Sequence, residues 1–275
     1  MYETNFHKAS TAQDAAALLA KSDDGKILAG GQTLIPTMKQ RLAAPADLVD
    51  LSRAEALRGV TITKRKKMGI MKADGGETIT IGAMTTHAEV AGNTELAQVC
   101  PVICGLAGNI GDPAVRHRGT IGGSVANNDP AADYPAALLA LGATIHTNSR
   151  DIAAEDYFKG MFLTALDDME IITAVSFQAP VAGGYGKFPN PASRYAMAGV
   201  FVAKSVDGEV RVSVTGAGDN GVYRHAGLEA ALSADWAASA VDAVEVSTDG
   251  LMSDLHGTAA YRANLIKVMA KRALA

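Results

Sequence analysis

The sequence contains few aromatic residues and few cysteines. Phe, Trp and Tyr together make up 5% of its 275 residues, and Cys100 and Cys104 are its two cysteines. Two thiols neither build a disulfide framework nor complete a metal site. We therefore expect both to be small buried core residues that share one face of a helix, in a protein of the reducing cytoplasm.

Long stretches of one chemical character are also missing. No apolar segment is long enough to span a bilayer, and the first ten residues lack the basic start and apolar stretch of a secretory signal. The net charge is −4 and the longest basic run is KRKK at 64–67, so nucleic-acid binding has no support. The six histidines show neither the HxH nor the HExxH spacing of a metal site.

The composition and the periodicity that are present indicate a globular α+β protein. With 48% hydrophobic and 20% charged residues over this length, we expect two or three structural units. The first fifty residues predict a small α/β lobe of two helices and two strands, with Thr11 or Ser10 capping the first helix. Alternation predicts two or three antiparallel strands over 59–86. Thr86 and Glu89 then form a capping box for an interrupted helical stretch.

A stretch rich in Gly and Pro marks the start of the C-terminal part. A strand closes at Pro180, and we place a domain boundary at residues 181–191. Two strands and then helices follow. The chain therefore predicts an α+β fold with an N-terminal α/β lobe (1–55), a second α+β lobe (56–178) and a C-terminal α+β domain (179–275).

Two glycine pairs point to a ligand. AGGQT at 29–33 and TIGGS at 120–124 each carry a hydroxyl residue. Glycine lets the backbone approach a ligand closely, and consecutive exposed N–H groups bind anions. Two such loops that converge would hold both phosphates of a dinucleotide, with Asp133 accepting hydrogen bonds from sugar-like hydroxyls. The alternative for each pair is a plain turn, which is the commoner use of Gly-Gly.

A third group of glycines offers a rival site. Gly216, Gly218 and Gly221 have the G-x-G-x-x-G spacing of a dinucleotide-binding fingerprint, and a predicted strand precedes them. The fingerprint requires its helix to begin within the glycines, whereas the helical pattern here starts near Ala226. We therefore interpret this stretch as a structural turn.

Four segments together resemble one protein family. They are, in order, ILAGGQTLIPTMKQRLAAPADLVDLS, GTIGGSVANNDPAADYPAALLALGA, EIITAVSFQAP and KFPNPASRYAMAGVFVA. This combination is similar to the FAD-binding medium subunit of the molybdenum hydroxylases, which include carbon monoxide dehydrogenase and the xanthine dehydrogenases. The resemblance covers nearly the whole chain. It implies a two-lobed FAD-binding domain of the vanillyl-alcohol-oxidase/PCMH type, followed by a small α+β domain.

The resemblance also implies functional residues. In the family both glycine motifs cradle the FAD diphosphate, Asp133 corresponds to the acid that bonds the flavin's polar chain, and Ile172 lies against the cofactor. Tyr195 is the candidate for covering the isoalloxazine ring. Plain core packing is the alternative for Ile172, and an ordinary buried tyrosine is the alternative for Tyr195. The implied binding residues are Ala29, Gly30, Gly31, Gln32, Thr33, Thr120, Ile121, Gly122, Gly123, Ser124, Asp133, Ile172 and Tyr195.

Two further features stand beside this pattern. The stretch 64–78 is longer than the family's usual hairpin, and it either reaches a partner or is solvated. His117, just before the second glycine motif, either touches a phosphate, links a flavin covalently, or caps the loop. Of these, loop capping is the favoured hypothesis.

The implied function is electron transfer through non-covalent FAD. Electrons arrive from the iron–sulfur clusters of a small partner subunit and leave to NAD, a quinone or oxygen, while the substrate is oxidised on a large molybdopterin subunit. We expect a heterotrimer, doubled, in the cytoplasm or held at the inner face of the membrane by its partners. Two alternatives stay open: a stand-alone flavin oxidase or reductase of the same fold, and a non-enzymatic module for another phosphate ligand.

Overall fold

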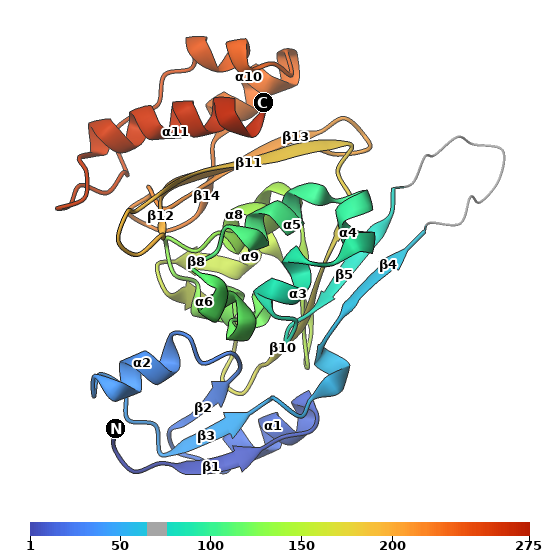
Figure 1. The fold of residues 1–275 in the computed structure, drawn as a ribbon, viewed down its shortest axis with the longest axis vertical. Helices are drawn as coiled ribbons and strands as arrows, with labels where there is room; N and C mark the ends of the chain where they lie inside the picture. The colour runs from blue at the N-terminus through green and yellow to red at the C-terminus, as the bar shows by residue number, and fades with distance from the viewer. Residues whose placement is uncertain (65–75) are drawn as a thin grey trace.

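Three larger sheets and one two-stranded hairpin form the described part of the chain, and Figure 1 shows the three larger sheets in sequence order along its long axis. The computed structural model describes residues 1–64 and 76–275. The long loop predicted at 64–78, and any third strand within 59–86, fall largely outside the described residues. The small N-terminal sheet lies at one end, and the C-terminal sheet with its helices lies at the other (Figure 1).

The N-terminal sheet is parallel, with the strand order β1-β3-β2. The Thr11 hydroxyl caps the first helix by accepting a hydrogen bond from the Asp14 N–H over 3.0 Å, as the sequence predicts. Strand β1 was not predicted, because four residues of mixed polarity give too short a pattern. The elements are β1 (Asn5–Lys8), α1 (Ala12–Leu19), β2 (Gly25–Leu28), α2 (Leu34–Lys39) and β3 (Asp47–Asp50).

The middle sheet is antiparallel, with the order β4-β5-β10-β6-β7, and carries the largest core. Ile79, Ile81 and Val175 are fully buried on one face, against the helices that follow β5. The predicted capping box of Thr86 and Glu89 is confirmed at the start of α3. The strands are β4 (Val60–Thr63), β5 (Thr78–Gly82), β6 (Thr144–Thr147), β7 (Asp151–Ala153) and β10 (Ile172–Gln178), with a small hairpin of β8 (Phe158–Gly160) and β9 (Leu163–Thr164). The helices are η1 (Glu55–Leu57), α3 (His87–Ala91), α4 (Thr94–Val99), α5 (Pro101–Gly108), α6 (Pro113–Arg118), α7 (Ile121–Asn127), α8 (Tyr134–Ala140) and α9 (Ala154–Tyr157).

The C-terminal sheet is antiparallel and covered on both faces. Val200 and Val202 belong to the core under α11, whereas Phe201 and Ala203 pack into the core of the middle unit. Figure 1 shows this sheet between α11 and α8. Its strands are β11 (Ala182–Pro189), β12 (Ala196–Lys204), β13 (Val210–Thr215) and β14 (Tyr223–Arg224), and its helices are α10 (Ala226–Ala234), η2 (Ala238–Ala243) and α11 (Ala259–Ala273).

No strand was predicted at 181–191, whereas most of this stretch is strand β11. Its glycines do not break the strand but let α11 approach it. A Cβ atom at Gly184 would lie 1.7 Å from the carbonyl oxygen of Ala273, and one at Gly186 would lie 2.2 Å from that of Met269. Glycine inside a strand here marks close backbone approach.

Two smaller predictions have mixed outcomes. Gly216 and Gly221 have φ of 80° and 93° and lie in the connection from β13 to its antiparallel partner β14, which fits the turn interpretation. Cys100 and Cys104 are buried and free, as expected. Cys100 is not helical, however, because it sits at φ −149° between α4 and α5, where the following Pro starts a new helix.

Candidate functional site

One cavity of about 640 Å³ collects residues from all three parts of the chain. Its walls come from the loop after β2, the start of α7, the beginning of β10 and the connection between β11 and β12. Every predicted binding residue lines this cavity except Ile121, which is fully buried in the middle core. The tertiary structure therefore brings together residues from 29 to 195.

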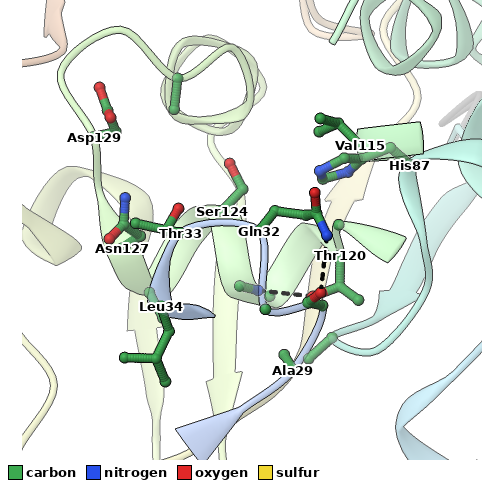
Figure 2. A pocket seen from close by; sticks show the side chains of 18 of the residues that line it. Ala29, Gln32, Thr33, Leu34, His87, Val115, Thr120, Ser124, Asn127 and Asp129 are labelled. Atoms are coloured by element: carbon green, nitrogen blue, oxygen red, sulfur yellow. Dashed lines mark hydrogen bonds between the residues drawn. The ribbon is translucent and has the colours of Figure 1, made fainter. Parts of the chain in front are cut away.

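The first glycine motif forms the loop between β2 and α2. Gly31 has φ +72°, a left-handed conformation that favours glycine. Gly30 packs against the residues that come just before the second motif. A Cβ atom at Gly30 would lie 2.2 Å from the Arg118 carbonyl oxygen. The Gln32 side-chain amide donates to the Gly30 carbonyl over 3.3 Å (Figure 2). In the part of the chain that the structure describes, the main-chain N–H groups of Gly31, Gln32 and Thr33 have no protein acceptor, so they are available to an anion.

The N–H groups of the second motif are already engaged. Thr120 caps α7, because its Oγ1 accepts a hydrogen bond from the Gly123 N–H over 3.1 Å. The N–H groups of Ile121 and Gly122 donate to carbonyl oxygens of the segment after β5, over 3.1 and 2.9 Å. The row of exposed N–H groups expected at both motifs is therefore found at the first loop and not at the second.

The glycines of the second motif allow close approach instead. A Cβ atom at Gly122 would lie 2.6 Å from the Cβ of Ala83, so this glycine lets α7 sit directly on the segment after β5. A Cβ atom at Gly123 would lie 3.7 Å from the Cβ of Ala29, so this glycine faces the first loop. Ser124 contributes its hydroxyl to the same cavity (Figure 2). The two motifs thus adjoin, and each supplies a different kind of group.

Asp133 is buried, and both its carboxylate oxygens are bonded by residues of β11. The Tyr185 hydroxyl donates to one oxygen, and the Lys187 ammonium donates to the other over 2.9 Å. Burial raises the pKa of Asp133, and the positive charge of Lys187 opposes that rise. Lys187 also donates to the Asn109 carbonyl over 3.1 Å and lines the cavity. A carboxylate held this way presents its remaining lone pairs as acceptors.

Ile172 and Tyr195 approach the cavity from different sheets. Ile172 begins β10 and is 4% exposed. Tyr195 precedes β12 and is 50% exposed, so the alternative of an ordinary buried tyrosine is wrong. The buried Asn190 closes the loop that carries Tyr195, because its N–H donates to the Tyr195 carbonyl over 2.7 Å and its carbonyl accepts from the Arg194 N–H over 2.8 Å. The Tyr195 ring therefore lies at the cavity on a loop that main-chain hydrogen bonds hold in place.

Several polar residues of the cavity were not expected from the sequence. Tyr185 and Lys187 lie two positions apart on one face of β11, and this signal was overlooked because no strand was predicted at 181–191. Asp129 lines the cavity, and burial raises its pKa. His87 lines it too, whereas His117 is exposed on α6 and is not among the described residues that line it. Across residues 1–64 and 76–275 no group of His, Cys, Asp and Glu side chains is placed to hold a metal ion.

Comparison with known proteins identifies the class of site. Residues 2–178 match the family described as "FAD binding domain in molybdopterin dehydrogenase". The nicotine 6-hydroxylase medium subunit of Paenarthrobacter nicotinovorans is 34% identical, over 95% of this chain and 93% of that protein. The carbon monoxide dehydrogenase medium chain of Afipia carboxidovorans is 32% identical, over 98% and 95% of the two chains.

Solved structures agree over the full length. A carbon monoxide dehydrogenase structure from Hydrogenophaga pseudoflava has a TM-score of 0.84 at 30% identity, covering 99% of this chain and 96% of that one. Quinoline 2-oxidoreductase from Pseudomonas putida 86 has a TM-score of 0.83 at 26% identity, covering 99% and 95%. The fold and the cavity thus define an FAD-binding flavoprotein of the oxidoreductase class.

The chain belongs to the family of FAD-binding medium subunits of molybdenum hydroxylases. Its role is that of an electron-transfer subunit, and such subunits work within complexes of several chains. The residues of the cavity fit this cofactor, because free N–H groups suit phosphate and the apolar wall at Ile172 suits a flavin ring. None of the described helices has both the length and the apolar character needed to cross a membrane.

Proposed function

We propose that FAD binds non-covalently along this cavity, with its diphosphate between the two glycine motifs. The observation that carries the proposal is the row of free N–H groups at Gly31, Gln32 and Thr33 beside the start of α7. Asp133 accepts hydrogen bonds from the polar chain of the flavin, and Lys187 keeps that carboxylate in place. Ile172 forms an apolar wall against the ring. The remaining binding residues are Ala29, Gly30, Thr120, Gly122, Gly123, Ser124 and Tyr195, with Ile121 supporting them from the core.

FAD, when bound, supplies the redox chemistry, and this chain supplies binding, orientation and a partly dry site. Tyr195 limits access of water to the ring, and the main-chain donors of the first loop neutralise part of the phosphate charge. No catalytic acid or base of this chain is required for electron transfer.

The division of the chain follows the sheets in this proposal. Residues 1–55 and 56–178 form the two lobes that hold the cofactor, and 179–275 form the domain that carries Tyr195 over it. Each of the three has a sheet of its own, which supports the division.

We infer that the partners are a small iron–sulfur subunit and a large molybdopterin subunit, in a heterotrimer that is doubled, in the cytoplasm. Support comes from two relatives named as a medium subunit or a medium chain. Co-expression of the chain with its genomic neighbours tests this assembly. A complex that contains flavin, iron and molybdenum in fixed ratio is the expected result, and purification of the chain alone, with turnover of a substrate by itself, is the contrary one.

Substitution of the glycines tests the FAD site. Gly31→Val places a side chain where φ is +72° and where Ile35 Cγ1 is 2.9 Å away, and Gly123→Val fills the space facing Ala29. We expect both to abolish flavin uptake, measured by absorbance near 450 nm, while the circular dichroism spectrum is retained. Gly105→Ala, in α5 with nothing within 4 Å of the added Cβ, is the matched control. Normal FAD content in both valine variants would contradict the assignment.

A further inference from the structure

We propose that His87 is a further binding residue of this site, whose Nε2–H donates a hydrogen bond to a phosphate oxygen of the bound dinucleotide. The proposal rests on the proposed function, which places the diphosphate beside the second glycine motif. His87 belongs to neither glycine motif, and it lines the cavity between Val115 and the first loop (Figure 2).

The main chain anchors His87 to the second motif. Its N–H donates to the Gly119 carbonyl over 2.9 Å, and the neighbouring Thr86 and Thr120 form an antiparallel bridge. The capping box of Thr86 and Glu89 fixes the turn from which the imidazole projects. The imidazole therefore starts from a backbone that is held in place before any ligand binds, which lowers the entropic cost of the contact.

The Nε2 edge of the imidazole packs against Gly119, in the volume that a side chain there would fill. A Cβ atom at Gly119 would lie 2.6 Å from His87 Nε2 and 2.8 Å from Cδ2. The backbone of Gly119 does not itself require glycine, because φ is −60° and ψ is 141°, values that any residue adopts. Glycine is therefore needed at position 119 because the Nε2 edge of His87 occupies the place of a side chain. Both residues line the cavity.

The other ring nitrogen determines where the proton sits. His87 is 5% exposed, and its Nδ1 is buried with no hydrogen-bond partner among the described residues. A buried N–H without an acceptor is rarer and less favourable than a bare acceptor, so the neutral ring carries its proton on Nε2. Burial and the charge of Arg116 lower the pKa of His87 to about 4, which keeps the ring neutral at pH 7.

These facts select an oxyanion as the ligand group. A neutral, fixed Nε2–H at the cavity wall is a donor without an acceptor of its own among the described residues. The Tyr134 ring packs 5.4 Å from the imidazole centroid and helps to fix its orientation. A phosphate oxygen accepts such a donor in a charge-assisted hydrogen bond, which is stronger than a neutral one.

The test compares affinities of the full, flavin-free chain for FAD, ADP and riboflavin by titration calorimetry. His87→Gln keeps a nitrogen donor near the Nε2 position, His87→Asn moves it toward Nδ1, and His87→Phe removes it. We expect His87→Phe and His87→Asn to lower the affinity for FAD and for ADP about tenfold or more. The affinities of His87→Gln should stay within about threefold of those of wild type. Riboflavin affinity should stay unchanged in all three variants.

Gly119→Ala and an NMR measurement give independent evidence. The alanine should act like His87→Phe, because its methyl group would collide with Nε2 and displace the imidazole. In the wild-type chain, ¹⁵N resonances should show the Nε2–H form, and ADP should shift the Nε2 resonance most. Unchanged ADP affinity in His87→Phe, an equal loss for riboflavin, or an Nδ1–H form would overturn the role of His87. Absence of FAD binding by wild type would instead overturn the proposed function together with it.

Discussion

Lys187 of β11 donates a hydrogen bond to the carboxylate of Asp133 at the start of α8 over 2.9 Å. The two side chains are 7% and 5% exposed, so this ion pair lies inside the protein. It joins the C-terminal sheet to the wall of the cavity. Together with the Tyr185 hydroxyl, which donates to the same carboxylate, it fixes that sheet against the residue that we propose binds the cofactor.

Removing the Lys187 ammonium group should lower the stability of the fold. Lys187→Met leaves Asp133 buried without its counter-charge, and breaking such a pair costs about 3–5 kcal/mol of stability. Urea unfolding measures this loss directly. The double variant Asp133→Asn with Lys187→Met should lose less than Lys187→Met alone, because no unpaired charge is left. Equal stability of Lys187→Met and wild type would show that the pair contributes little.

The pair of Glu170 and Arg150 should make stability depend on acid pH. Arg150 donates from Nε and Nη2 to the two carboxylate oxygens over 3.0 Å each, and these bonds lower the pKa of Glu170 from 4.5 to about 2. A depressed pKa gives stability that is complete above pH 4.5 and is lost as the pH falls toward 2. Because Arg150 is half exposed, we expect about 1–3 kcal/mol.

Urea unfolding of wild type and Glu170→Gln between pH 2 and pH 7 checks this expectation. The variant should be less stable than wild type at neutral pH and should show a flatter profile between pH 4.5 and pH 2. Parallel profiles of the two proteins would remove Glu170 as the source of the acid dependence.

Gly30 should tolerate no side chain. The Cβ atom of Gly30→Ala would lie 2.2 Å from the Arg118 carbonyl oxygen, so the first loop must move away from the end of α6. We expect the free energy of unfolding to fall by about 1–3 kcal/mol and FAD to bind more weakly. Thermal unfolding measures the first effect and flavin titration measures the second. Gly105→Ala should be neutral or slightly stabilising, because alanine is the better helix former and the space is open. A Gly30→Ala protein that matches this control would argue against close contact of the loops.

Tyr195 should affect the flavin and not the fold. Its ring is half exposed, so Tyr195→Ala should change the free energy of unfolding by about 0.5 kcal/mol or less. If the ring covers the isoalloxazine, flavin fluorescence of the loaded chain should rise in Tyr195→Ala and stay quenched in Tyr195→Phe, which keeps an aromatic face. Identical fluorescence in Tyr195→Ala and wild type would place the tyrosine away from the ring.

Local patterns in the sequence anticipated much of the architecture. Thr11 and the Thr86–Glu89 box marked helix starts, because capping depends on residues three positions apart. Alternation in 78–82 predicted β5, because the two-residue period of a strand is visible within five residues. Strand β11 was not predicted because its glycines are required by contact with α11, which lies some eighty residues further along the chain.

The two glycine motifs, the strand and helix periods and the resemblance that unites them follow from the sequence, since each is written in neighbouring residues. The folded chain was needed to show that, among the described residues, the first loop keeps its N–H groups free while the second uses them for packing. It also showed Lys187 bonded to Asp133 and the imidazole edge of His87 packed against Gly119. Those outcomes depend on which distant backbone atoms fill the space around each residue, and no local pattern encodes that space.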